Sequence, residues 1–445
     1  MRPPVGSPAI TFDHVELQQV VQPTTDDMME AMGINTHPGL ARPQKEMMSR
    51  LLSEVGRIFH LPNPTLLPML GEDGKPQTFR LNMKHDQAIR TRPYKTSPAL
   101  QVELHKKIDE LVKWGVLVES PHGGSFLSKY SSAVILVKKP TGDYRYVVDF
   151  RRVNAALHTP IIDLPSLDDI LDECGARAGK PAAQVLSTFD IKESYHCMTI
   201  DERDRHILCC NAGGRFLAYT RAPMGLSPSS AWLIATLTRM FSHTYDGGGI
   251  MNGKPALHNF VAIFADDFLI HSANMEEHLL HIRWVFKQFF KYQVTLSLKK
   301  AVFAKKEVTF LAHRIHTEPV LSIKPLEERC LAIKDMPAPT DVTGVRRWLG
   351  VCSYYRRYIQ DYSRIASPVT ALLRDDVEFN WTQKCQESMD EFKKKLTSFP
   401  VNCVRDHSLP LIIRCDGSRT GIGAVLVQAD RITPWMQKVL DKDNG

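Results

Sequence analysis

Apolar residues recur along this chain with two different spacings, which predict helices in some segments and strands in others. A helical spacing of three to four residues runs through 98–118, 227–241 and 276–292. Short apolar runs of strand length lie at 132–138, 144–149, 185–190, 207–210, 260–270 and 308–315. Long helices among short strands predict an α+β fold, in which helices cover one side of an antiparallel sheet.

The two ends of the chain follow different patterns. Residues 1–75 are rich in proline, methionine and turn formers, and only 47–59 show helical spacing, so we expect a loosely ordered lead-in. Helical spacing returns after Pro325 and continues to Leu373. Two further apolar runs, at 411–415 and 422–428, predict a final pair of strands.

Composition narrows the class of protein. The 445 residues are about three times the usual ~150-residue domain, so we expect more than one domain. A net charge of +7 permits a polyanionic partner. Nine scattered cysteines without a CxxC pair indicate a reducing compartment rather than a disulfide framework or a zinc module. No apolar run approaches the ~20 residues of a membrane span, so we predict an intracellular, cytoplasmic protein without membrane contact.

One pair of acids interrupts an otherwise apolar run. Asp266 and Asp267 lie between apolar residues that predict two buried strands, and Asp190 ends another such run. If these strands are neighbours, the carboxylates of Asp190 and Asp266 converge and repel each other unless a divalent cation lies between them. Hard oxygen ligands select Mg²⁺ or Mn²⁺, and two such ions serve phosphoryl transfer. The alternative is an acid pair that is protonated or hydrogen-bonded by sheet neighbours.

The order of several motifs resembles a known family. The segments are YRYVVDFRRVN at 144–154, FDIKESY at 189–195, PMGL at 223–226 and FADDFLIHS at 264–272. Shorter ones follow, namely FLAH at 310–313, WLG at 348–350, YYR at 354–356 and DGS at 416–418. Each motif alone is weak, but the ordered set resembles the reverse transcriptase of gypsy-type long-terminal-repeat retrotransposons and of their relatives, the caulimoviruses. The resemblance covers roughly residues 75–430.

This resemblance implies a right-hand polymerase fold and a metal site. It implies fingers and palm in 76–318, thumb and connection helices in 319–400, and a truncated RNase H-like fragment in 401–445, after the lead-in. The family's two palm motifs supply metal ligands, which here are Asp190, Asp266 and Asp267 for two Mg²⁺ ions. The main-chain carbonyl of Ile191 would complete the ligand set.

The resemblance also implies nucleotide contacts. Tyr195 stands where the family keeps an aromatic ring beneath the sugar, which leaves no room for a 2′-hydroxyl. Arg145, with Lys138 and Lys139, matches the basic residues that hold the triphosphate, and guanidinium donors suit phosphate oxygens. Gly225 would let the backbone approach nucleotide and template. The alternatives are a core tyrosine, a solvated hairpin end and an ordinary turn glycine.

Nucleic-acid contacts are expected in the C-terminal half. Phe310 and Leu311 match the hairpin that grips the primer end. Five arginines occur between 346 and 364, and Arg346, Arg347 and Arg357 fall outside the apolar stripe of the predicted helix. A thumb position would place these three along nucleic-acid phosphates, whereas the alternative is a solvated face.

Some positions depart from the family pattern. Phe264 replaces a Tyr, Met224 a frequent Phe, and Ala312 a Gly, but no metal ligand is lost. Asp416 resembles the first carboxylate of a ribonuclease H, a nuclease that needs several acids, including a Glu. No Glu follows Asp416, so we expect no RNase H activity.

The combined prediction is an RNA-directed DNA polymerase that extends a primer on an RNA or DNA template with dNTPs. One alternative is a catalytically silent, nucleic-acid-binding remnant of a retrotransposon Pol protein. Another is an RNA-dependent RNA polymerase, which should lack an aromatic gate at Tyr195. The sequence leaves the oligomeric state open.

Overall fold

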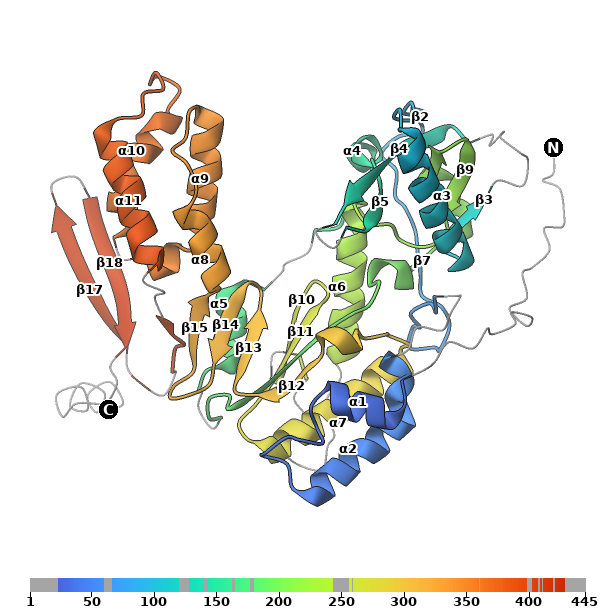
Figure 1. The fold of residues 1–445 in the computed structure, drawn as a ribbon, viewed down its shortest axis with the longest axis horizontal. Coiled ribbons are helices and arrows are strands. Elements are labelled where there is room, and N and C mark those ends of the chain that lie inside the picture. Colours follow the sequence, from blue (N-terminus) through green and yellow to red (C-terminus); the bar gives the residue numbers. More distant parts are fainter. Residues whose placement is uncertain are drawn as a thin grey trace.

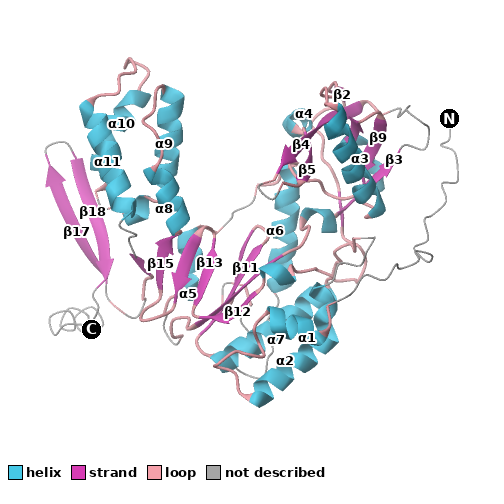
Figure 2. Ribbon diagram, viewed as in Figure 1, coloured by secondary structure: helices cyan, strands magenta, loops and turns pink. Residues whose placement is uncertain are grey.

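The computed structural model has two arms that rise from a common base (Figure 1). It describes residues 23–59, 66–119, 128–139, 142–161, 165–176, 180–242, 256–257, 259–359, 361–397, 402–406, 409, 411–418 and 421–428. Helices and strands occur together in the base and in both arms, which confirms the mixed α and β class (Figure 2). No described helix is long and apolar enough to cross a membrane.

The base of the molecule is built on a four-stranded sheet with the order β10-β11-β6-β12. Its strands are β6 (Val185–Asp190), β10 (Val261–Phe264), β11 (Asp267–Ser272) and β12 (Val302–Lys305). Every neighbouring pair is antiparallel, as the sequence predicts. The apolar run at 260–270 is therefore two strands joined by a tight turn that contains Asp266.

Both faces of this sheet are buried, so the prediction of helices on one side only is wrong. Phe189 and Phe268 face the core formed with helices α6 (Ser227–Phe241) and α7 (Met275–Lys291). Leu186, three residues before Phe189, and Leu269, next to Phe268, face the other way and belong to a second core that includes helix α5 (Leu167–Cys174). A strand buried on both faces is a near-continuous apolar run without polar alternation, as at 260–270. Such a run indicates burial on both faces, but it does not show which elements cover each face.

The right-hand arm in Figure 1 contains the second large sheet. Its strands are β2 (Ile89–Arg90), β3 (Leu117–Glu119), β4 (Tyr130–Lys138), β5 (Tyr144–Val148), β8 (Cys209–Ala212) and β9 (Arg215–Tyr219). β4 and β5 form the predicted antiparallel hairpin, but β4 pairs in parallel with both β2 and β8, so this sheet is mixed. The predicted strand at 207–210 begins only at Cys209, because residues Glu202–Leu208 form a 3₁₀ helix that the Asp201 side chain caps.

Helices complete this arm. They are α3 (Pro98–Lys113) and α4 (Arg151–Ala156). Ser97 caps α3, Pro98 occupies its first position, and Gly115 follows its end with a φ of 68°. Two short strands, β1 (Thr78–Phe79) and β7 (Thr199–Ile200), pair in parallel nearby.

The N-terminal segment is not loosely ordered where the structure describes it. Residues 23–59 form α1 (Thr25–Ala31), α2 (Arg42–Val55) and the 3₁₀ helix η1 (Gly56–Phe59). These elements pack beside α7 under the sheet (Figure 1), and the Phe59 ring lies 5.4 Å from that of Phe286. The methionines that suggested a loosely ordered lead-in are core side chains in this segment. Met48, for example, is fully buried. Residues 1–22 lie outside the described residues.

The left-hand arm begins with the sheet β13-β14-β15-β16 and continues into helices. The strands are β13 (Glu307–Phe310), β14 (His313–His316), β15 (Ser322–Pro325) and β16 (Asn402–Cys403). The helices are α8 (Glu327–Lys334), α9 (Val342–Tyr354), α10 (Tyr362–Thr370) and α11 (Gln383–Thr397), with 3₁₀ turns at η5 (Arg356–Tyr358) and η6 (Ala371–Leu373). Trp348 of α9 and Phe392 of α11 are in its core.

The predicted apolar stripe of this arm is interrupted. Helix α9 ends at Tyr354, and the chain turns at Asp361, which has a φ of 60°. The stripe residues Val345, Trp348, Cys352, Tyr355 and Ile359 are nonetheless buried, and Leu349 is half-buried. At the C-terminal end, β17 (Leu411–Ser418) and β18 (Gly421–Gln428) form the predicted antiparallel pair.

We expect the N-terminal helices to contribute to the stability of the base. Replacing the buried Leu52 of α2 by Ala should lower the free energy of unfolding by about 2–4 kcal/mol, because the cavity lies in the shared core. Urea unfolding measures this change. Ser53→Ala, on the exposed side of the same turn, is the control; equal stability of both variants would contradict the packing.

Candidate active site

The three predicted metal ligands meet at one end of the β6–β11 pair. In the antiparallel register Asp267 lies directly opposite Asp190. Asp266 precedes Asp267 in the turn between β10 and β11, where Phe264 pairs with Asp267. Strand pairing therefore brings together Asp190 and Asp267, which lie 77 positions apart in the sequence, with Asp266 next to them.

The turn itself does not require the acids. Its left-handed residue is Ala265, with a φ of 54°, whereas Asp266 does not have positive φ. Asn, Asp or Gly at a turn is commonly explained by left-handed backbone, and that explanation does not apply to Asp266. The acids are therefore better explained by the chemistry of their side chains.

Burial and mutual repulsion disfavour the charged forms of these acids. Burial raises the pKa of Asp266, and the charge of Asp190 raises it further. The pKa of Asp267 is raised by burial and then by Asp266 and Asp190. A cluster of oxygen donors that repel one another attracts a cation.

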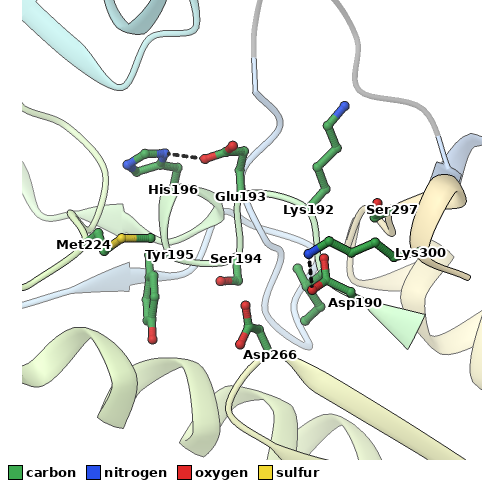
Figure 3. Close-up of a pocket in the computed structure, with 11 residues that line it drawn as sticks. Asp190, Lys192, Glu193, Ser194, Tyr195, His196, Met224, Asp266, Ser297 and Lys300 are labelled. Atoms are coloured by element: carbon green, nitrogen blue, oxygen red, sulfur yellow. Dashed lines mark hydrogen bonds and ion pairs between the residues drawn. The ribbon is translucent and has the colours of Figure 1, made fainter. Parts of the chain in front are cut away.

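A positively charged side chain, that of Lys300, belongs to the site and was not predicted from the sequence. The ammonium group of Lys300 lies 2.8 Å from the Oδ1 atom of Asp190 (Figure 3). Lys300 ends the 3₁₀ helix η4 (Leu298–Lys300), and the bond to Asp190 raises its pKa. Its charge also opposes the upward shifts at Asp266 and Asp267. The only sequence signal was a Lys-Lys pair just before the strand β12.

The donor set fits a hard divalent cation chemically. Three carboxylates lie at the same strand end, and the backbone at Ile191 is tied to the turn because its N–H donates to the Asp266 carbonyl at 3.2 Å. In the described part of the chain, no three His, Cys, Asp or Glu side chains are placed so as to hold an ion together. Release of Asp190 by Lys300 is one adjustment by which these oxygens would gather around a metal.

A pocket of about 230 Å³ opens beside the carboxylates (Figure 3). Asp190, Asp266 and Lys300 line one part of it, and Tyr195 and Met224 line another. The Tyr195 ring is half-buried, and its hydroxyl lies 3.2 Å from the Oγ atom of Ser230 on α6. Because the Tyr195 ring borders both the pocket and the core, its position agrees with both interpretations: a ring that excludes a 2′-hydroxyl, and a core tyrosine that only packs.

The mouth of this pocket carries further charged groups. His196 lies 3.1 Å from Glu193, and this contact lowers the pKa of Glu193, with smaller effects from Lys139 and Lys192. Lys139 of the β4–β5 hairpin is thus close enough to act on the pocket. Arg145 and Lys138 are exposed on that hairpin and do not line the pocket.

Gly225 has a left-handed backbone, which agrees with the prediction that this glycine lets the backbone approach nucleotide and template. Its φ is 85°, and its carbonyl accepts a bond of 2.9 Å from the Asn154 amide. The Asn154 side-chain oxygen in turn accepts from the Ser227 N–H at 2.9 Å. Asn154, which the sequence analysis assigned no role, therefore fixes this turn; its position at the end of the 144–154 motif was the available signal.

The predicted primer-gripping hairpin lies on the other side of the acids. Phe310 and His313 pair across the β13–β14 turn, which consists of Leu311 and Ala312. A second cavity of about 310 Å³ is lined by this turn together with Asp190, Asp267 and Lys300.

The arginines of the left-hand arm differ in their surroundings. Arg346 and Arg347 are exposed on α9. Arg364 instead lies near Asp361 and Glu391. The side chains of Arg357 and Asp416 lie outside the described residues.

Comparisons with known proteins agree with this geometry. Residues 137–315 match the family described as reverse transcriptase (RNA-dependent DNA polymerase), and 381–437 match an RNase H-like domain found in reverse transcriptase. Structures of the foamy viral protease-reverse transcriptase, with double-stranded DNA and with an RNA/DNA hybrid, align with TM-scores of 0.74 and 0.70 at 20% identity. They cover 94% and 97% of this chain, and 68% and 57% of theirs. The chain has a reverse transcriptase fold.

Sequence relatives of this chain are Pol polyproteins of transposons. The polyprotein of transposon 412 from Drosophila melanogaster is 28% identical over 78% of the chain. That of transposon 297, from the same organism, is 26% identical over 91%, and the Tf2-3 polyprotein of Schizosaccharomyces pombe is 25% identical over 76%. The chain covers only 26%, 38% and 23% of these relatives, respectively.

The raised pKa values of the acids predict a cost in stability. For Asp266 the folded pKa exceeds the unfolded one, so the folded state loses stability as pH rises above the ordinary value of 3.8. Asp266→Asn should therefore raise the Tm of the metal-free protein at pH 7, on the order of 1–3 °C. The gain should shrink as pH is lowered toward 3.8. Mg²⁺ should stabilise the wild type more than the variant.

Thermal unfolding at several pH values, with and without Mg²⁺, measures these effects. Asp375→Asn, at an exposed Asp-Asp pair, is the matched control. A Tm of Asp266→Asn equal to or below that of the wild type at pH 7 would contradict the proposed repulsion.

Proposed function

We propose that this chain is an RNA-directed DNA polymerase of a gypsy-type retroelement, which extends a primer with dNTPs by two-metal phosphoryl transfer. The observation that carries the proposal is the pairing of Asp190 with Asp267, with Asp266 in the adjacent turn, on a sheet of reverse transcriptase fold. Transposon Pol relatives support the retroelement origin.

The three aspartates would hold the metal ions, with the Ile191 carbonyl as a further oxygen ligand. Bound Mg²⁺, or Mn²⁺, would supply Lewis-acid activation of the primer hydroxyl and neutralise charge on the departing pyrophosphate. Without bound metal, Lys300 neutralises the negative charge of Asp190, and it has to release Asp190 when the metal ions bind. Because the acids already share one strand end, little backbone rearrangement is needed to place them.

The nucleotide would occupy the pocket beside the acids. Tyr195 would lie under the sugar, held by Ser230, and exclude a 2′-hydroxyl. The triphosphate would be held by Arg145, Lys138 and Lys139 of the β4–β5 hairpin. Support for a hairpin role comes from the effect of Lys139 on Glu193, which lines the same pocket.

The template and primer would lie between the two arms. The turn with Phe310 and Leu311 would contact the primer, and the Gly225 turn would contact the nucleotide and template. Arg346 and Arg347, together with Arg357, would bind phosphates, which gives affinity that falls with salt and carries little sequence information. We propose that the protein works inside the cell, in the cytoplasm.

RNase H activity is not part of the proposal, although residues 381–437 match an RNase H-like domain. The expectation that RNase H activity is lacking stays a prediction. The division into a lead-in to 75, fingers and palm to 318, thumb and connection to 400, and an RNase H-like fragment thereafter also stays a prediction.

Primer extension on an RNA template tests the function. Asp190→Asn should reduce Mg²⁺-dependent incorporation about a thousandfold or more, because metal-ion stabilisation contributes several kcal/mol to the transition state. Asp375→Asn should extend like the wild type. Full activity of Asp190→Asn would refute the site, and a wild type that binds primer-template without extending it would identify the silent remnant.

The sugar gate has its own test. Tyr195→Ala should narrow the preference for dNTP over rNTP by about 10- to 200-fold, because the pocket then admits the 2′-hydroxyl. Tyr195→Phe keeps the ring and should keep the preference. Comparison of kcat/KM for the two nucleotides measures this, and an unchanged ratio in Tyr195→Ala would leave Tyr195 as a packing residue.

A further inference from the structure

The turn beside the catalytic aspartates is held by a contact from the left-hand arm. The carbonyl oxygen of Leu311 accepts a hydrogen bond of 2.9 Å from the Tyr354 hydroxyl. The same oxygen lies 2.7 Å from the His313 Nδ1 atom, which must be the donor because a carbonyl can only accept. One backbone oxygen thus receives two side-chain donors.

This turn needs support because both of its residues are left-handed. Leu311 has a φ of 47° and Ala312 a φ of 58°. Residues with a Cβ atom adopt this region at a cost in free energy, and two in succession in a hairpin are normally Asn or Gly. Such backbone persists only where its surroundings hold it. The two donors on Leu311 are contacts that do so.

The supporting side chains belong to an aromatic cluster at the end of α9. The His313 ring lies 5.3 Å from that of Tyr354 and 5.8 Å from that of Tyr358. His313 is buried, whereas Tyr354, the last residue of α9, is 51% exposed. A half-exposed tyrosine whose hydroxyl reaches the backbone of another element is not explained by burial alone.

The position of the turn gives this contact a functional consequence. The cavity that it lines is shared with Asp190, Asp267 and Lys300. Helix α9 also carries the exposed Arg346 and Arg347. The Tyr354 hydroxyl therefore connects the helix proposed to bind phosphates with the turn proposed to hold the primer end.

We infer that Tyr354 is a positioning residue: its hydroxyl holds the Leu311–Ala312 turn in the left-handed conformation and so fixes the primer 3′ end relative to Asp190 and Asp267. The inference rests on the proposed polymerase function for its effect on rate. Through this contact, the placement of α9 on the duplex sets the placement of the reacting primer terminus.

Tyr354→Phe tests this inference, because it removes the donor and keeps the ring. The matched control is Tyr362→Phe, which removes a hydroxyl bonded at 2.9 Å to Ser353 in the same arm. We expect the single-turnover incorporation rate per active site to fall about three- to tenfold in Tyr354→Phe, the size of one lost hydrogen bond. The rate of Tyr362→Phe should stay within twofold of the wild type, roughly the lower limit for such a bond.

A second readout does not depend on catalysis. 2-Aminopurine at the primer 3′ terminus reports by fluorescence how firmly the terminal base is held in the complex without dNTP. We expect brighter emission, from a less stacked base, with Tyr354→Phe than with the wild type or Tyr362→Phe. If the wild type did not polymerise, the proposed function would fail, but this measurement would still test the contact.

Ala312→Gly tests the same turn by changing its backbone preference instead of its hydrogen bond. Gly adopts the left-handed conformation without the Cβ penalty, so loss of the Tyr354 hydroxyl should matter less in the double variant than in Tyr354→Phe alone. Equal rates and equal fluorescence for Tyr354→Phe and the wild type would overturn the inference. So would an equal loss in Tyr362→Phe, or a loss in Tyr354→Phe that Ala312→Gly leaves unchanged.

Discussion

The register between β6 and β11 is the constraint on which the site depends. It places Asp190 opposite Asp267, with Asp266 in the next turn, and so forces three carboxylates into one half-buried place. Burial and repulsion make that arrangement unfavourable for the charged forms, as the raised pKa values of Asp266 and Asp267 indicate. Lys300 offsets part of the cost. An arrangement that is costly without a bound cation is well prepared to receive one.

The carboxylates cannot relieve their repulsion by moving apart, because the sheet is buried on both faces. Phe189 and Phe268 pack against rings of α7 at 5.2 and 5.0 Å on one face, while Leu186 and Leu269 belong to the core of the other. The N-terminal helices add to the first core through contacts such as Phe59 with Phe286. Apolar packing on both sides thus keeps the acidic strand ends together.

Several segments around the site have left-handed backbone. Ala265 precedes Asp266, Gly225 lies in the turn after Met224, and Leu311 and Ala312 form the turn on the far side of the acids. Other elements bond to these turns: Asn154 bonds to Gly225, Tyr354 to Leu311, and the Ile191 N–H to the carbonyl of Asp266, next to Ala265. A strained backbone conformation that contacts from other elements maintain is typical of functional sites, where turns must hold side chains or ligands in defined positions.

Spacing, turn residues and motif order are properties of neighbouring positions, so the amino-acid pattern was enough to predict the local elements and to single out the acids. It predicted the strands at 132–138 and 144–149, the strand that ends in Asp190, the strand pair on either side of Asp266 and Asp267, and helices at 227–241 and 276–292. Which residues surround these elements and acids became visible only in the folded protein. The Lys300 contact, the packing of residues 23–59, the second buried face of the sheet and the Tyr354 bond all join segments through space, and each depends on side-chain placement that no local pattern encodes.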